Sequence, residues 1–183
     1  VLKPAFQQAC LKAIEAFAAD TADGGPGVII GTPWPQDDRC YNAVALLDGG
    51  RIEAMRFKVE LPNYGVFDEL RVFAKGPLPA PAMFRGVSLG LPICEDMWFP
   101  QVAECYLETG AELLIVPNGS PYNAGKTGER MRVAARRVSE TRLPLIYANQ
   151  CAGQDELVFD GGSFGLNADG ATVFQMAQFE PGM

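Results

Sequence analysis

Apolar residues recur every three or four positions near the start of the chain, between residue 3 and about residue 19. Phe6, Cys10, Ile14 and Phe17 fall on one side of a helix at this spacing. The stretch DGGPG that follows is rich in helix-ending residues. The pattern therefore predicts an amphipathic helix over this segment.

A change to strand-like patterns follows this helix. The stretch GVIIGTP predicts a short buried strand, and residues 41–61 predict two strands joined by a turn at DGG. A loop rich in proline and glycine is expected from Leu61 to about Pro81.

The second half alternates strand and helix patterns before it ends in short strands. We expect a strand over 87–94, a helical pattern over 95–110, a strand over 112–121, a helix over 128–142 with its arginines on a solvated side, a buried strand over 143–150, and a hairpin pair over 157–176 with its turn at NADG. This order predicts a layered α/β fold.

Length and charge restrict the classes of protein to consider. The chain has 183 residues, 48% of them hydrophobic, which suits a single domain with a sizeable core. Its formal net charge of -7 would repel a phosphate backbone, so we expect no nucleic-acid partner. The apolar runs are far shorter than the ~20 residues of a bilayer span, and we expect no membrane segment.

The cysteines disfavour both a disulfide framework and a zinc site. They are odd in number, irregularly spaced and without a CxxC pair: Cys10, Cys40, Cys94, Cys105 and Cys151. A reducing compartment, the cytoplasm, is the expected location. The N-terminus also lacks the pattern of a secretory signal.

The sequence contains no histidine, which excludes the Cys-His and Ser-His catalytic pairs. The stretch GGSFG, which contains Ser163, matches a nucleophile-elbow pattern but lacks the histidine that such a serine requires. A carboxylate base acting with a lysine is the remaining way to activate a nucleophile.

Cys94 is the candidate nucleophile. It ends an apolar stretch and precedes an expected helix start, where backbone N–H groups favour a thiolate and can hold a developing oxyanion. The alternative is a buried core thiol, since free cysteine is among the most buried residue types. Glu95 and Asp96 would then be ordinary helix-start acids.

A second group of polar residues follows the strand that ends near Lys58. A proline-containing loop brings Tyr64, Asp68 and Glu69 close behind this lysine, which supplies a cation, a phenol and two carboxylates. An isolated lysine at a strand end is usually solvated, and this alternative stays open.

Five stretches together carry a resemblance to a known family: KVELPNYGVFDE, LPICEDMW, VPNGSPYNAGK, LPLIYANQ and AGQDELVFDGGSF. They cover most of the chain and resemble the nitrilase superfamily of carbon-nitrogen hydrolases. The most similar branch is the glutaminase domains of glutamine-dependent NAD synthetases. The resemblance implies a nitrilase-like α-β-β-α sandwich formed by a single domain, residues 1–183.

The resemblance also implies a site that uses a cysteine, a lysine and a glutamate. Cys94 would be the nucleophile, and Lys58 would stabilise the oxyanion together with the backbone N–H of Glu95. Glu69 occupies the position of a second, supporting glutamate.

By the same resemblance, Tyr64, Ser120 and Lys126 would contact L-glutamine. The family commonly has an arginine or a lysine at the last of these positions, where a cation suits the substrate carboxylate. For Ser120 and Lys126, the alternative is that they are ordinary loop residues.

The family places its general-base glutamate on a strand upstream of the first helix seen here, so we expect it before Val1. We expect the chain to be truncated at both ends and to have little glutaminase activity alone. No cofactor is expected in this part, whereas ATP and magnesium would belong to a C-terminal synthetase domain. That domain and a second copy of the chain are the expected partners.

Two other functions stay open. One is a stand-alone amidase or carbamoylase of the nitrilase type. The other is a catalytically silent domain of the same fold, retained for oligomer contacts.

Overall fold

The computed structural model describes residues 1–182. The chain divides into two compact units, Val1–Ala82 and Met83–Met183. Each unit combines helices with a β-sheet, and each is described by itself.

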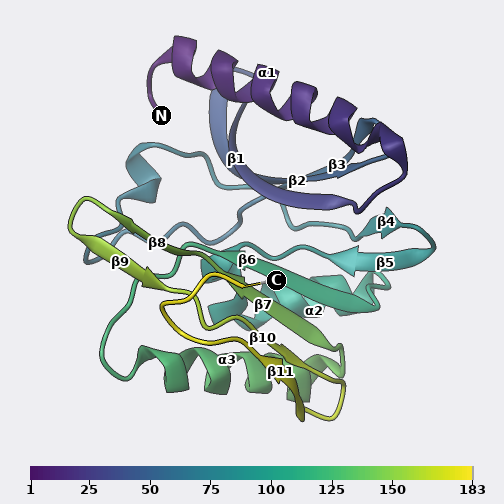
Figure 1. The fold of residues 1–183 in the computed structure, drawn as a ribbon, viewed down its shortest axis with the longest axis vertical. Coiled ribbons are helices and arrows are strands. Elements are labelled where there is room, and N and C mark those ends of the chain that lie inside the picture. The colour runs from purple at the N-terminus through teal and green to yellow at the C-terminus, as the bar shows by residue number, and fades with distance from the viewer. Residues whose placement is uncertain (183) are drawn as a thin grey trace. The chain divides into compact units, whose positions relative to one another are not determined.

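Unit 1 consists of one helix on a three-stranded antiparallel sheet (Figure 1). Its elements in chain order are α1 (Pro4–Asp20), η1 (Thr21–Asp23), β1 (Val28–Gln36), β2 (Arg39–Asp48), β3 (Arg51–Phe57) and η2 (Glu69–Arg71). Ile14 and Ala18 of the helix pack with Ala45 and Leu47 of the central strand β2. This confirms the predicted helix and the predicted hairpin between β2 and β3.

Strand β1 differs from the short buried strand that the sequence predicts. It pairs with β2 along its whole length, from Val28 opposite Leu47 to Gln36 opposite Arg39. As an edge strand it is only half-buried. The residues between the two strands, Asp37 and Asp38, have φ of 51° and 59°, the left-handed region that a tight hairpin turn requires.

The loop after β3 returns to the end of that strand. The N–H of Gly76 donates to the carbonyl of Lys58 at 2.8 Å. A Cβ at residue 76 would lie 2.7 Å from Phe57 atoms, so only glycine allows the loop to approach this closely. The expected irregular loop is confirmed, and it fixes the backbone at Lys58.

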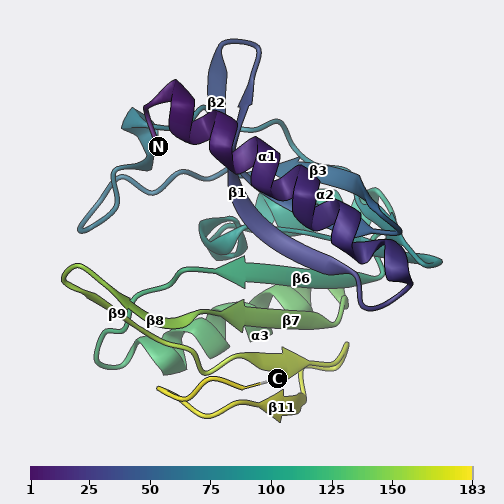
Figure 2. The ribbon, with the colours of Figure 1, turned by 45° about the horizontal axis from the view of Figure 1, so that its top comes forward.

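Unit 2 contains a six-stranded mixed sheet in the order β11-β10-β7-β6-β5-β4, together with a separate β8–β9 hairpin. Its elements are β4 (Ala82–Phe84), β5 (Val87–Gly90), η3 (Cys94–Trp98), α2 (Pro100–Glu108), β6 (Leu113–Asn118), α3 (Lys126–Thr141), β7 (Leu145–Asn149), β8 (Cys151–Gln154), β9 (Leu157–Asp160), β10 (Phe164–Leu166) and β11 (Thr172–Gln175). Strands β5, β6 and β7 are parallel. Figure 2 shows β6 and β7 side by side with α3 behind them.

Two elements near Cys94 are shorter than the sequence predicts. Strand β5 ends at Gly90, and Pro92 beyond it has no N–H to donate to a sheet. The expected helical pattern over 95–110 is split into η3 and α2, with Pro100 at the start of α2. Cys94 therefore begins a tight turn between strand and helix.

The last strands pair partly as predicted. β10 and β11 form a hairpin around NADG, and β9 pairs with β8. The β8–β9 pairing was not predicted. Among residues 1–182, no helix is long and apolar enough to cross a bilayer.

Candidate active site

Cys94 has an unusual backbone conformation. Its φ of 48° lies in the left-handed region, where residues other than glycine are uncommon and tend to cluster at functional sites. The turn is closed by Asp96, whose Oδ2 accepts a hydrogen bond from the N–H of Ile93 at 2.9 Å. Asp96 is thus a buried turn-capping acid, whereas Cys94 itself is only partly buried.

Glu95 follows Cys94 in the first turn of η3, and its side chain is buried. The first N–H groups of a helical turn lack acceptors within that turn. The location is consistent with the predicted role of the Glu95 backbone as an oxyanion donor, which stays a prediction.

Tyr147 on β7 connects Cys94 with Ser120. Burial raises the pKa of the Tyr147 phenol above its ordinary value, and the nearby Cys94 thiolate raises that pKa further, while a hydrogen bond with Ser120 lowers it. The ring stacks on Phe164 with 4.9 Å between centroids. Two predicted site residues of unit 2 therefore lie in one neighbourhood around a buried phenol.

Ser120 follows β6 and is only 4% exposed. Its Oγ accepts a hydrogen bond from Arg130 Nε at 3.1 Å, and its backbone N–H donates to Asn149 Oδ1 at 3.0 Å. Ser120 is therefore held from neighbouring elements through both its side chain and its backbone, and its contact with a substrate stays a prediction.

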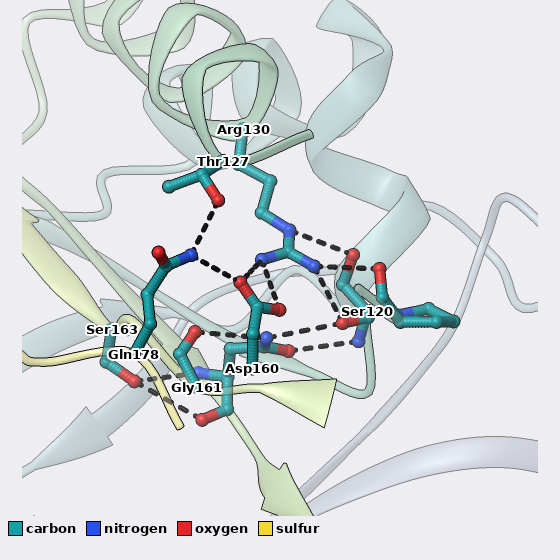
Figure 3. Close-up of polar contacts among 9 residues, drawn as sticks. Ser120, Thr127, Arg130, Asp160, Gly161, Ser163 and Gln178 are labelled. Carbon is teal, nitrogen blue, oxygen red and sulfur yellow. Dashed lines mark hydrogen bonds and ion pairs between the residues drawn. The ribbon is translucent and has the colours of Figure 1, made fainter. Parts of the chain in front are cut away.

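Arg130, on α3, lies between Ser120 and Asp160 and contacts both (Figure 3). Its Nη1 donates to both carboxylate oxygens of Asp160, at 2.8 and 3.0 Å. Both side chains are almost completely buried. The prediction of solvated arginines on this helix is wrong for Arg130.

In unit 1, Lys58 is buried, with 2% of its side chain exposed, and its Nζ donates to Glu69 Oε1 at 2.6 Å. The other carboxylate oxygen of Glu69 accepts from Asn42 Nδ2 at 3.2 Å. The backbone of Asn42 also accepts from the N–H of Lys58 at 2.8 Å. The alternative of a solvated strand-end lysine is therefore wrong, and Lys58 pairs with Glu69, one of the two carboxylates expected close behind it.

The Lys58 ammonium retains capacity for a further acceptor. An ammonium carries three N–H donors, and within residues 1–182 the structure records one hydrogen bond from it, to Glu69. Such a group can hold a negative oxygen while its position is fixed by the glutamate.

A model of the carbon-nitrogen hydrolase family matches residues 5–183. This chain belongs to the carbon-nitrogen hydrolase family.

Curated relatives of this hydrolase include glutamine-dependent NAD(+) synthetases. The protein from Rhodobacter capsulatus is 47% identical over 180 residues, which cover 98% of this chain and 32% of the relative. The protein from Xanthomonas campestris pv. campestris is 41% identical over 183 residues, with the same two coverages. The chain thus spans about a third of the length of these relatives.

Solved structures agree with the predicted nitrilase-like mixed α/β fold. A glutamine-dependent NAD+ synthetase from Acinetobacter baumannii matches with a TM-score of 0.86 and 30% identity, covering 96% of this chain and 34% of that one. An amidase of the nitrilase superfamily from Nesterenkonia AN1 matches with a TM-score of 0.83 and 27% identity, covering 96% and 66%. In another structure of the Nesterenkonia amidase, the acetamide moiety of fluoroacetamide is attached covalently at the active-site cysteine.

The remaining predicted residues of this carbon-nitrogen hydrolase are more accessible. Tyr64 is 58% exposed and packs edge-on against Phe67, with 5.8 Å between ring centroids. Lys126 is the first residue of α3 and is half-buried. Their predicted contacts with a substrate stay predictions.

A second arginine of α3 also contradicts the prediction of a solvated side. Arg137 is 2% exposed, its Nη2 donates to Glu140 Oε1 at 3.3 Å, and burial lowers the pKa of its guanidinium. Arg132 and Arg136 are exposed, as predicted.

Several polar residues around Ser120 were missed at the level of sequence: Asn149, Tyr147, Asp160 and Gln178. A signal for the buried arginines was present. Arg130, Ala134 and Arg137 lie four and three positions apart, which places both arginines on the face that carries the buried alanine.

Proposed function

We propose that this chain is the glutaminase part of a glutamine-dependent NAD synthetase. The observation that carries the proposal is 47% identity with such a protein over 98% of the chain. The reaction would convert L-glutamine and water into glutamate and ammonia.

Cys94 is the proposed nucleophile. Its sulfur would attack the side-chain carbonyl of glutamine, ammonia would leave from the tetrahedral intermediate, and water would hydrolyse the resulting thioester. The left-handed backbone at Cys94, its incomplete burial and the capping of its turn by Asp96 support this role.

Lys58 and the backbone N–H of Glu95 are the proposed donors to the oxyanion of that intermediate. The buried contact with Glu69 supports the assignment of Lys58, because it orients the ammonium. Glu69 is proposed to be the supporting glutamate, itself fixed by Asn42.

Tyr64, Ser120 and Lys126 are the proposed contacts of glutamine. Lys126 would pair with the substrate carboxylate, and the exposed Tyr64 ring offers an apolar surface with a polar end. Ser120 has the best structural support, because it is held firmly beside Tyr147.

The ammonia would serve the amidation of deamido-NAD to NAD by a synthetase domain that uses ATP and magnesium. The relatives are about three times as long as this chain, which leaves room for such a domain in them. Association with a second copy and a cytoplasmic location belong to the same proposal.

Glutamine hydrolysis with ammonia detection tests the function in the whole protein. We expect release of one ammonia per glutamate, loss of this release in Cys94→Ala, and far slower turnover of simple aliphatic amides. A preference for aliphatic amides over glutamine would favour a stand-alone amidase instead, the activity for which the Nesterenkonia relative is named.

A further inference from the structure

The guanidinium of Arg130 makes an unusually complete set of hydrogen bonds to one loop and one carboxylate. Nη2 donates to the carbonyls of Ser120 and Pro121 at 2.8 and 2.9 Å, and Nε donates to Ser120 Oγ at 3.1 Å. Nη1 takes the two oxygens of Asp160. Every nitrogen of the planar fork is engaged, so the plane of the group is fixed.

Asp160 is held in turn from a third direction, as Figure 3 shows. Its Oδ2 accepts from Gln178 Nε2 at 2.7 Å, and the same amide nitrogen donates to Thr127 Oγ1 at 2.7 Å. Thr127 lies one turn before Arg130 on α3. Asp160, Gln178 and Thr127 thus form a chain of hydrogen bonds that leads from the Arg130 guanidinium back to α3.

This arrangement determines how Ser120 presents its hydroxyl. A guanidinium has donors and no acceptor, so Ser120 Oγ accepts from Arg130, and its own hydrogen is directed to its hydrogen bond with Tyr147. Asn149 Nδ2 and Arg130 Nη2 both donate to the Ser120 carbonyl, at 3.3 and 2.8 Å. Both the backbone and the hydroxyl of this residue are therefore set by the Arg130 group.

The burial of the Arg130 and Asp160 charges indicates that this pair does more than stabilise the fold. Well-packed hydrophobic side chains of similar volume often stabilise a protein interior as much as a buried ion pair does. Here three of the five hydrogen bonds from the guanidinium end on Ser120 and Pro121, the loop that the substrate is proposed to touch.

We propose that Arg130 is a positioning residue for the substrate contact at Ser120, with Asp160 and Gln178 as its support. The inference rests on the proposed function of this chain. Arg130 acts through Ser120 and has no contact with the reacting atoms. Its loss weakens the binding of glutamine and leaves the nucleophile competent.

The experiment compares Arg130→Lys with Arg136→Lys in the whole protein. Both residues lie on α3 and both pair with a carboxylate, but Arg136 is exposed. A lysine at 130 keeps the charge and cannot reproduce the fork. We expect the KM for glutamine to rise about tenfold or more, as for loss of a hydrogen bond to a charged group, with kcat within about threefold. Arg136→Lys keeps both constants.

Two further measurements separate positioning from folding. The rate at which iodoacetamide alkylates Cys94 should be unchanged in Arg130→Lys, because that reaction does not need Ser120. Gln178→Ala, which removes the outer support only, should raise KM about two- to threefold with an unchanged melting temperature, and it decides the question if Arg130→Lys does not fold.

The proposal is overturned if the variants lose activity only through a smaller folded fraction, with the wild-type KM in the molecules that remain active. It is also overturned if Gln178→Ala is stable and has the wild-type KM. Absence of glutamine hydrolysis in the wild-type protein is a different result, which refutes the proposed function itself.

Discussion

Two buried ion pairs, Lys58 with Glu69 in unit 1 and Arg130 with Asp160 in unit 2, are built differently. In unit 1, Lys58 meets Glu69, whose side chain is still 16% exposed, through a single contact of 2.6 Å. In unit 2, Arg130 meets Asp160, which is 0% exposed, through two contacts, and its remaining donors go to a loop. One cation keeps donors available, and the other has committed all of its nitrogens.

The difference follows from the chemistry of the two cations. A lysine ammonium is a compact charge with three rotatable donors, whereas an arginine guanidinium is a rigid fork. The first suits a group that must meet a transient oxyanion, and the second suits a group that holds an architecture. The difference supports the proposed roles of Lys58 in the reaction and of Arg130 in the support of Ser120.

The largest expected effect on stability comes from removing the guanidinium of Arg130. Arg130→Met leaves the Asp160 carboxylate buried beside an apolar chain, and we expect the free energy of unfolding to fall by about 3–5 kcal/mol. Urea unfolding followed by circular dichroism measures it. A loss below about 1 kcal/mol would contradict the view that this pair is structural.

The largest expected effect on activity comes from removing the ammonium of Lys58. Lys58→Met removes an oxyanion donor, and we expect glutaminase kcat to fall by about 10²–10³. Its stability should fall less than that of Arg130→Met, because Glu69 is partly exposed and keeps its bond from Asn42. The matched control is Lys75→Met, which breaks the surface pair with Glu60. Near-normal turnover in Lys58→Met would break the comparison.

Alkaline pH gives a smaller effect that is specific to unit 2. Burial raises the pKa of folded Tyr147, so above the unfolded value of about 10 the unfolded chain loses this proton while the folded chain keeps it. Stability should then fall with rising pH, by up to about 1.4 kcal/mol per pH unit from this residue. Tyr147→Phe should flatten the slope, and Tyr122→Phe, at an exposed ring, should leave it unchanged. Equal slopes in all three proteins would contradict the assignment.

The smallest effect is expected at an ion pair on the surface of the same helix. Arg136 is 73% exposed and pairs with Glu140 four residues later. Arg136→Met should change the free energy of unfolding by less than about 0.5 kcal/mol, because exposed pairs are screened by solvent. Thermal unfolding beside Arg130→Met checks this, and similar losses in the two variants would erase the contrast between buried and exposed arginines.

Local patterns in the sequence predicted most elements of both units. The spacing of Phe6, Cys10 and Ile14 predicted α1 because a helix buries one face, and the turn DGG predicted the β2–β3 hairpin. The β8–β9 pairing was missed because β8 is a short, exposed stretch of mostly small residues, CAGQ, without apolar alternation. The early end of β5 was missed although the sequence offered a signal, because Pro92 just beyond it has no N–H to donate to a sheet.

The candidate site was predictable in part. The pairing of Lys58 with Glu69 joins residues eleven positions apart in one loop, and the family resemblance identified both. Arg130 and Asp160 are thirty positions apart and belong to residue types that are rarely buried, so each alone favours an exposed interpretation. Only the tertiary contact shows that their charges compensate each other.

The central claim is that Cys94 is the nucleophile that attacks the glutamine side chain. A chloroketone analogue of glutamine, applied to the whole protein and followed by peptide mass spectrometry, tests it most directly. We predict labelling of Cys94 alone among the cysteines, protection by free glutamine, and loss of ammonia release in proportion to labelling. Equal labelling of Cys94 and the exposed Cys151, or full ammonia release from protein labelled at Cys94, would contradict the claim.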